Sequence, residues 1–181
     1  MVKRTFVIAD THFGHKNICQ FSDKYGKQLR PWNNPDDMDE AMVTLWNETV
    51  RPEDKVYCLG DIAINRRCIS TIGRCNGDKV LIKGNHDIAK LKEFTPYFRD
   101  IRACQTFGKV ILTHIPIHPQ CMDRWDLNIH GHLHTENIKL KKMYFSKISD
   151  PRYFCVSAEQ INYKPILLEE AIEKLKQQLG E

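Results

Sequence analysis

Five short strand-like runs in this 181-residue chain are each followed directly by residues of the kinds that bind metals. The runs have the length and composition of buried strands and lie at 2–9, 55–59, 79–83, 110–113 and 127–130. The residues that follow them are Asp10-Thr11-His12, Gly60-Asp61, Gly84-Asn85-His86-Asp87, His114 and Gly131-His132-Leu133-His134. Open α/β sheets place their sites beyond the carboxyl ends of their strands. We therefore expect these five loops to meet at one edge of the fold.

The rest of the pattern predicts one α/β domain over residues 1–181. Asn34-Pro35 is typical of a helix start, and an apolar stripe at helical spacing follows it. Further strands are expected at 153–156 and 163–167, before an amphipathic C-terminal helix from Leu168 to Leu179. These strands exceed what one parallel sheet needs. The predicted fold is a four-layer α-β-β-α sandwich of two mixed sheets flanked by helices, with the metal site at the strand C-terminal ends.

Composition places the chain among globular proteins. Hydrophobic residues make up 41% and charged residues 28%. No apolar run approaches the ~18 to 20 residues that span a membrane, so no membrane partner is expected. The N-terminus has no small-residue cleavage pattern, so we expect no secretory signal and a cytoplasmic location.

Cysteine usage and charge limit the alternatives. The seven cysteines are odd in number and form no C-x-x-C pair, which predicts reduced, mostly buried thiols and disfavours a thiolate zinc site. The net charge of +4 is mild and favours an anionic substrate. The basic residues are scattered; Lys139 to Lys142 is the one compact cluster, and we predict a solvated loop there.

The polar segments combine carboxylates, imidazoles and an amide, a mixture that suits borderline divalent metals. They supply enough ligands for two metals. Gly84 to Asp87 has no packing rationale after an apolar strand, and neither do three histidines at alternate positions 130, 132 and 134. Any one motif could arise by chance, but their order after successive strands indicates a functional site.

This ordered set resembles the calcineurin-like metallophosphoesterase superfamily, whose pattern runs D-x-H, GD, GNH[D/E], H, GHxH. All five blocks are present between Asp10 and His134. Residues 9–18, 46–47 and 54–61 also look like small single-domain members from bacteria and phages. The resemblance implies a first metal on Asp10, His12 and His134, a bridging Asp61, and a second metal on Asn85, His114 and His132. It also implies that His86 protonates the leaving oxygen, with Asp87 as an orienting partner.

Physical chemistry supports this division of roles. Two metals ~3.5 to 4 Å apart clamp a phosphate and generate hydroxide from bound water near neutral pH. A carboxylate such as Asp61 offers two oxygens for a bridge, and the neutral Asn85 keeps the site positive enough to hold a phosphoryl group. His86 can carry a proton at neutral pH. We expect two divalent ions per chain, with Mn favoured and Fe, Zn, Ni and Co compatible.

Four other residues have alternative interpretations. His130 is interpreted as a partner of a ligand or a buried strand histidine rather than as a ligand. His15, Arg30 and His118 are candidates for substrate binding. Each could instead be a surface loop residue, and for Arg30 a phosphate clamp and an exposed loop arginine are equally weighted.

The favoured function is a dinuclear metal-dependent phosphoesterase that hydrolyses phosphodiesters by metal-bound hydroxide, with His86 as general acid. The alternatives that use the same site are a phosphomonoesterase and a nucleotide pyrophosphatase or nuclease. A non-catalytic interaction scaffold and a structural zinc protein are less favoured, because every expected ligand is present and oxygen ligands are in excess. The expected partner is a phosphate ester such as a nucleotide or cyclic nucleotide. Nucleic acid is not favoured, and oligomeric state stays open.

Overall fold

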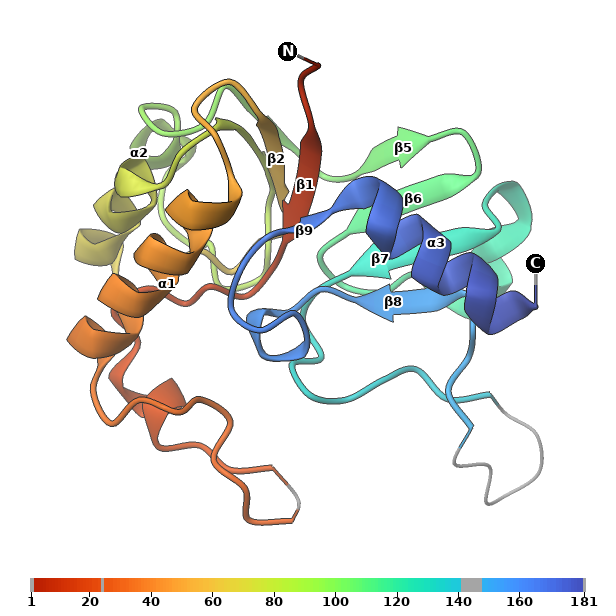
Figure 1. The fold of residues 1–181 in the computed structure, drawn as a ribbon, viewed down its shortest axis with the longest axis horizontal. Helices are drawn as coiled ribbons and strands as arrows, with labels where there is room; N and C mark the ends of the chain where they lie inside the picture. Colours follow the sequence, from red (N-terminus) through yellow and green to blue (C-terminus); the bar gives the residue numbers. More distant parts are fainter. Residues whose placement is uncertain (1, 24, 141–147, 181) are drawn as a thin grey trace.

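Two β-sheets and the helices beside them form the protein (Figure 1). The structure is a computed structural model that describes residues 2–23, 25–140 and 148–180. The predicted sandwich of two mixed sheets flanked by helices is confirmed. Lys141 and Lys142 of the basic cluster lie outside the described residues, whereas Lys139 is exposed as predicted.

The first sheet has the strand order β4-β3-β2-β1-β9. Its four parallel strands are β1 (Thr5–Ile8), β2 (Lys55–Cys58), β3 (Asp78–Ile82) and β4 (Asp100–Arg102). The short β9 (Ile166–Leu167) is antiparallel to β1. Parallel strands buried on both faces require continuous apolar sequence, and β1, β2 and β3 each bury every residue after the first.

The second sheet has the order β5-β6-β7-β8. Its parallel strands are β6 (Val110–Thr113), β7 (Leu127–His130) and β8 (Tyr153–Cys155), and β5 (Gln105–Phe107) pairs antiparallel with β6. All residues of β6 and β7 are buried. This burial explains why their sequences predict both strands with the observed bounds.

Helices and 3-10 turns connect the strands. The helices are α1 (Pro35–Thr49), α2 (Leu91–Phe94) and α3 (Leu168–Leu179), and the 3-10 segments are η1 (Lys16–Cys19), η2 (Arg66–Arg74), η3 (Pro119–Arg124) and η4 (Ala158–Gln160). The Asn34 side chain accepts a hydrogen bond from the Asp37 amide, so the predicted N-cap is confirmed. Among the described residues, no helix is long and apolar enough to cross a membrane.

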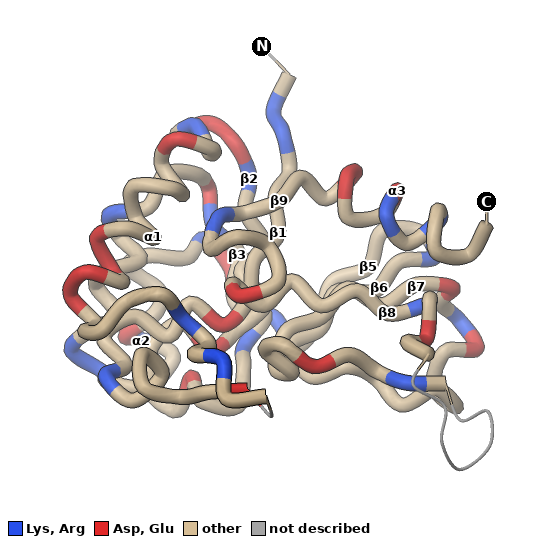
Figure 2. Tube along the Cα trace, turned by 60° about the horizontal axis from the view of Figure 1, so that its bottom comes forward, with Lys and Arg blue, Asp and Glu red and all other residues tan. Residues whose placement is uncertain are grey.

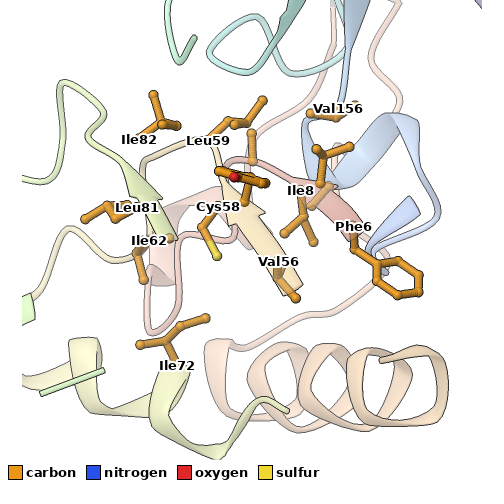
Figure 3. Packing of buried hydrophobic residues seen from close by; sticks show 14 of the residues in the cluster. Phe6, Ile8, Val56, Cys58, Leu59, Ile62, Ile72, Leu81, Ile82 and Val156 are labelled. Atoms are coloured by element: carbon orange, nitrogen blue, oxygen red, sulfur yellow. The ribbon is translucent and has the colours of Figure 1, made fainter. Parts of the chain in front are cut away.

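A continuous hydrophobic core holds these elements together. Figure 3 shows Ile8 of β1, Val56 of β2 and Leu81 of β3 in one cluster, with Ile72 of η2 on its helical side. Fully burying a side chain of this size stabilises a fold by about 1.5–3 kcal/mol. The same core keeps thiols inside: the described cysteines are all free, and four are buried, Cys19, Cys58, Cys75 and Cys155.

The carboxyl ends of the two sheets are joined backbone to backbone. Ala9, just after β1, donates from its amide to Val156 O at 2.9 Å and accepts from the Ala158 amide at 3.0 Å. This forms a parallel bridge between Ala9 and Ser157, the residue two positions after β8. The loops that follow the parallel strands of both sheets therefore face a common space, as predicted.

Three elements differ from the sequence predictions. β4 and β5 are strands that the sequence pattern does not reveal, because each has only three residues and none of them is buried. The strand predicted at 163–167 shortens to Ile166–Leu167. Asn162 and Tyr163 adopt positive φ in the preceding turn, which a strand cannot accommodate.

Candidate metal centre

Four of the five predicted loops bring six candidate ligands into two triads. Asp10, His12 and His134 form the first triad, and Asp61, His114 and His132 form the second. Within each triad, one potential donor atom from every residue lies within 4.8 Å of the others. The predicted grouping of these six residues into two candidate metal sites is therefore observed.

The backbone of these loops is strained. Positive φ occurs at seven described residues other than glycine, and five of them belong to the triads: Asp10 (57°), His12 (49°), Asp61 (54°), His132 (71°) and His134 (50°). Such conformations cost about 1–3 kcal/mol each and persist only where the surroundings enforce them. Their concentration at one place indicates a functional site.

Two motif glycines allow the loops to pack this closely. A Cβ atom on Gly84 would lie 2.2 Å from Asp61 Oδ1, and one on Gly131 would lie 2.6 Å from Asp10 Oδ2. Both distances are well inside van der Waals contact. Any larger residue at either position would push a candidate ligand out of place.

The first triad contains buried polar atoms without partners. Asp10 Oδ2 accepts hydrogen bonds from Ser157 Oγ (2.6 Å) and the His132 amide (2.8 Å), whereas Asp10 Oδ1 is buried and has none. Both ring nitrogens of His12 are also buried without a partner. Burial, reinforced by the nearby Arg30 charge, holds the pKa of His12 well below its usual range, so the ring stays neutral with a lone pair. Buried groups of this kind normally have partners, and a cation would satisfy them.

One carboxylate oxygen lies between the two triads. Asp61 Oδ1 accepts from the His86 amide at 2.8 Å. Asp61 Oδ2 lies 3.4 Å from His114 Nε2 and 3.7 Å from His12 Nε2. Burial alone would raise the Asp61 pKa, but the interactions with His114 and the hydrogen bond from the His86 amide outweigh it and lower the pKa, which keeps the carboxylate ionised. This oxygen can serve both triads at once.

The second triad gains a further oxygen from Asn85. His114 Nδ1 lies 2.7 Å from Leu59 O, and His114 Nε2 lies 2.8 Å from Asn85 Oδ1. When Nδ1 donates its hydrogen to the carbonyl, Nε2 and Oδ1 present lone pairs to the same space. The oxygen and imidazole donors of both triads fit two divalent cations of the borderline class.

In the loop after β3, His86 and Asp87 lie in different environments. His86 is exposed, and its ring centroid lies 5.7 Å from that of His12. Asp87 is fully buried, and its carboxylate accepts from the amides of Gly84, Asp61 and Ile62 at 2.8–2.9 Å. These contacts bind Asp87 to the loop backbone, in place of the predicted contact with the His86 ring.

Of the three residues predicted to bind substrate, Arg30 does not fit that role, and its prediction is wrong. It is completely buried, and its guanidinium donates to Glu159 Oε1 (2.9 Å) and to the carbonyls of Thr11 (2.7 Å) and Asp10. A phosphate could not reach it. The prediction failed because burial depends on Glu159, which lies 129 residues away in the sequence.

The two histidine candidates differ. His15 is half-buried, and its ring lies between those of His12 and Phe21, at centroid distances of 5.7 and 6.0 Å. It therefore borders the first triad. His118 is exposed and caps η3, where its Nδ1 accepts from the Gln120 amide at 3.2 Å. This contact gives His118 a local role at the start of η3.

His130 is a buried residue of β7. Its Nδ1 lies 2.7 Å from Gly131 O, and burial lowers its pKa to about 4. The ring packs against Tyr153 at a centroid distance of 6.1 Å. The interpretation of His130 as a buried strand histidine agrees with this environment.

Sequence reasoning missed two residues that contact the first triad. Ser157 binds Asp10, and Glu159 Oε1 lies 3.1 Å from His134 Nδ1. Burial would raise the Glu159 pKa, but the charge of Arg30 and the hydrogen bond from His134 outweigh it and hold the pKa at about 2. Both residues follow the apolar run at 153–156, so the strand-end rule used for the other loops could have found them.

Comparison with known proteins places the chain in a family. No family model matches it. "Uncharacterized protein MJ1445" of Methanocaldococcus jannaschii is 31% identical over 172 residues, which cover 93% of this chain and 89% of the archaeal protein. The chain belongs to the family of MJ1445.

Two further similarities concern a solved structure and a phage protein. The crystal structure of AQ665 from Aquifex aeolicus, described as a protein of unknown function, matches with a TM-score of 0.67 and 25% identity and covers 96% of this chain and all of that one. AQ665 therefore has a fold similar to that of this chain. The gene 66 protein of Mycobacterium phage D29 is 36% identical over 84 residues, 44% of this chain and 38% of the phage protein.

Proposed function

We propose that this protein is a dinuclear metal-dependent phosphoesterase of the calcineurin-like superfamily. The observation that carries the proposal is the position of Asp61 Oδ2, 3.7 Å from a ring nitrogen of one triad and 3.4 Å from a ring nitrogen of the other. Two independent metal sites would not need a shared carboxylate. The unpartnered buried atoms of Asp10 and His12 support the same conclusion.

The residues divide the chemistry between them. Asp10, His12 and His134 would hold one cation, His114, His132 and Asn85 the other, and Asp61 both. Two such cations supply a clamp for the phosphoryl group and lower the pKa of bound water. His86 is exposed beside the first triad, so its imidazole can donate a proton to the leaving oxygen and recover one from solvent.

A diester is the favoured substrate. A monoester carries a second negative charge, which enzymes usually bind with arginine. Arg30, the arginine predicted for this role, is buried and bound to Glu159. The proposed substrates are therefore phosphodiesters such as cyclic nucleotides. Nucleic acid is less favoured, because Lys and Arg are scattered among Asp and Glu over the molecule (Figure 2).

Hydrolysis of nitrophenyl phosphates tests this proposal. Wild type with Mn²⁺ should cleave the bis(nitrophenyl) diester faster than the nitrophenyl monoester. Asp61→Asn and His86→Gln should both lose the activity while keeping the wild-type circular dichroism spectrum. A strong monoester preference would favour a phosphomonoesterase with the same site. No cleavage with any divalent metal, despite two metals bound per chain, would contradict the enzyme proposal and favour the scaffold alternative.

A further inference from the structure

A buried ion pair adjoins the first triad, and among the residues that the structure describes the second triad has no counterpart to it. Arg30 and the Glu159 carboxylate are 0% and 2% exposed, and Arg30 Nε lies 2.9 Å from Glu159 Oε1. Burying two charges costs several kcal/mol per ion, so such pairs add little net stability by themselves. Their retention beside a candidate metal site therefore calls for another explanation.

The contacts of Arg30 give part of that explanation. Its guanidinium donates to the backbone carbonyls of Asp10 and Thr11, in the segment where Asp10 and His12 adopt positive φ. The positive charge of Arg30 therefore sits close to the first triad. By itself that charge would repel a divalent cation.

The contacts of Glu159 give the rest. Oε1 accepts from Arg30 and lies 3.1 Å from His134 Nδ1, so one oxygen serves both partners. An ionised carboxylate only accepts hydrogen bonds, and the hydrogen of the His134 ring must therefore be on Nδ1. The lone pair is left on Nε2, the nitrogen directed away from Glu159. Carboxylates that fix a histidine in this way raise the basicity of the metal-binding nitrogen.

We infer that Glu159, held in place by Arg30, is a positioning residue for the cation site of the first triad. It selects the His134 tautomer that leaves Nε2 free for a cation, and its negative charge offsets that of Arg30. The second triad obtains the same tautomer for His114 from the backbone carbonyl of Leu59 and needs no such pair. This inference rests on the proposed dinuclear function and adds an asymmetry between its two sites.

Metal titration of Glu159→Gln tests the inference. Mn²⁺ binding would be measured by calorimetry and by metal content after dialysis, with Glu173→Gln as the matched control on the exposed surface of α3. We expect one site to weaken 10–100-fold, the range for partners of metal ligands. The other site and the control should be unchanged. In a His134→Gln background, the same substitution should have no further effect.

Histidine nitrogen NMR provides a readout that does not depend on metal. Wild type without metal should show hydrogen on Nδ1 of His134, and Glu159→Gln should show a mixture of tautomers. A purely structural role for Glu159 would leave the tautomer unchanged in a folded variant, and that result would overturn the inference.

A second variant covers the case in which Glu159→Gln fails to fold with Arg30 unpaired. Arg30→Met combined with Glu159→Leu removes both charges at similar volume, which proteins often tolerate. This double variant should fold and still show one weakened site. If both sites keep the wild-type affinity for Mn²⁺ in either folded variant, the inference is overturned but the proposed function is not. Absence of metal from wild type would overturn the proposed function and the inference with it.

Discussion

The two triads have the same composition, one carboxylate and two imidazoles, but their supports differ. The second triad is held largely through backbone groups: Leu59 O binds His114, and the amides of Asp61 and Ile62 donate to Asp87. The first is held by side chains from distant segments, Arg30, Ser157 and Glu159. The comparison teaches that candidate ligands of one type can be positioned either through backbone groups or through the side chains of other residues. Both kinds of support include side chains that are not themselves candidate ligands, Asp87 at the second triad and Glu159 at the first.

Substitution of the shared carboxylate, Asp61, should affect both triads alike. Asp61→Asn loses the negative charge that faces both His12 and His114. We expect both metal sites to weaken and diester hydrolysis to fall on the order of 10³-fold, about 4 kcal/mol of transition-state stabilisation. The metal content of the dialysed variant and its rate of diester hydrolysis check these two expectations. Retention of one site at full affinity would contradict the shared role.

The backbone support of the second triad can be broken at Asp87. Asp87→Asn places an amide NH₂ against the converging amides of Gly84, Asp61 and Ile62, so buried donors lose their acceptor. We expect a loss of about 3 kcal/mol in the free energy of unfolding, measured in urea. Asp123→Asn, at an exposed position in η3, is the control and should be neutral. Equal stability of the two variants would show that these contacts do not support the loop.

A third carboxylate supports the first triad's loop and gives it a pH dependence. Asp39 of α1 accepts from the Gly14 amide at 3.0 Å, and burial raises its pKa to about 6. A raised carboxyl pKa favours the protonated fold, so its contribution is full below about pH 4 and is lost as the pH rises to about 6. Asp39→Asn cannot ionise and can still accept from Gly14. Above pH 7 it should be more stable than wild type by about 2 kcal/mol.

Unfolding curves at several pH values test that assignment. The stability difference between Asp39→Asn and wild type should open between about pH 4 and 6 and then stay constant. A difference that does not change with pH would mean that Asp39 does not titrate in this range.

The smallest effect is expected at Ser157. Ser157→Ala removes the 2.6 Å hydrogen bond to Asp10 Oδ2, while the His132 amide still binds that oxygen. We expect a loss of about 1 kcal/mol in stability and about tenfold in Mn²⁺ affinity at one site. Ser70→Ala, on the exposed surface of η2, is the control. A larger loss of Mn²⁺ affinity in Ser157→Ala than in Glu159→Gln would reverse the proposed ranking of these two supports.

The same contrast explains what the sequence could predict. The triads, Asn85 and His86 follow short buried strands of mostly apolar residues, so local pattern was sufficient to find them. The burial of Arg30 depends on Glu159, and no local pattern encodes a contact across 129 residues. The edge strands β4 and β5 were missed because their residues are not buried. The positive φ of five candidate ligands could not be predicted from the local sequence around Asp or His.

Electron paramagnetic resonance of the protein loaded with Mn²⁺ tests the central claim most directly. If Asp61 joins the two triads in one centre, the wild-type spectrum should be that of two exchange-coupled ions, and Asp61→Asn should abolish the coupling. A spectrum of isolated ions in fully loaded wild type would contradict the account.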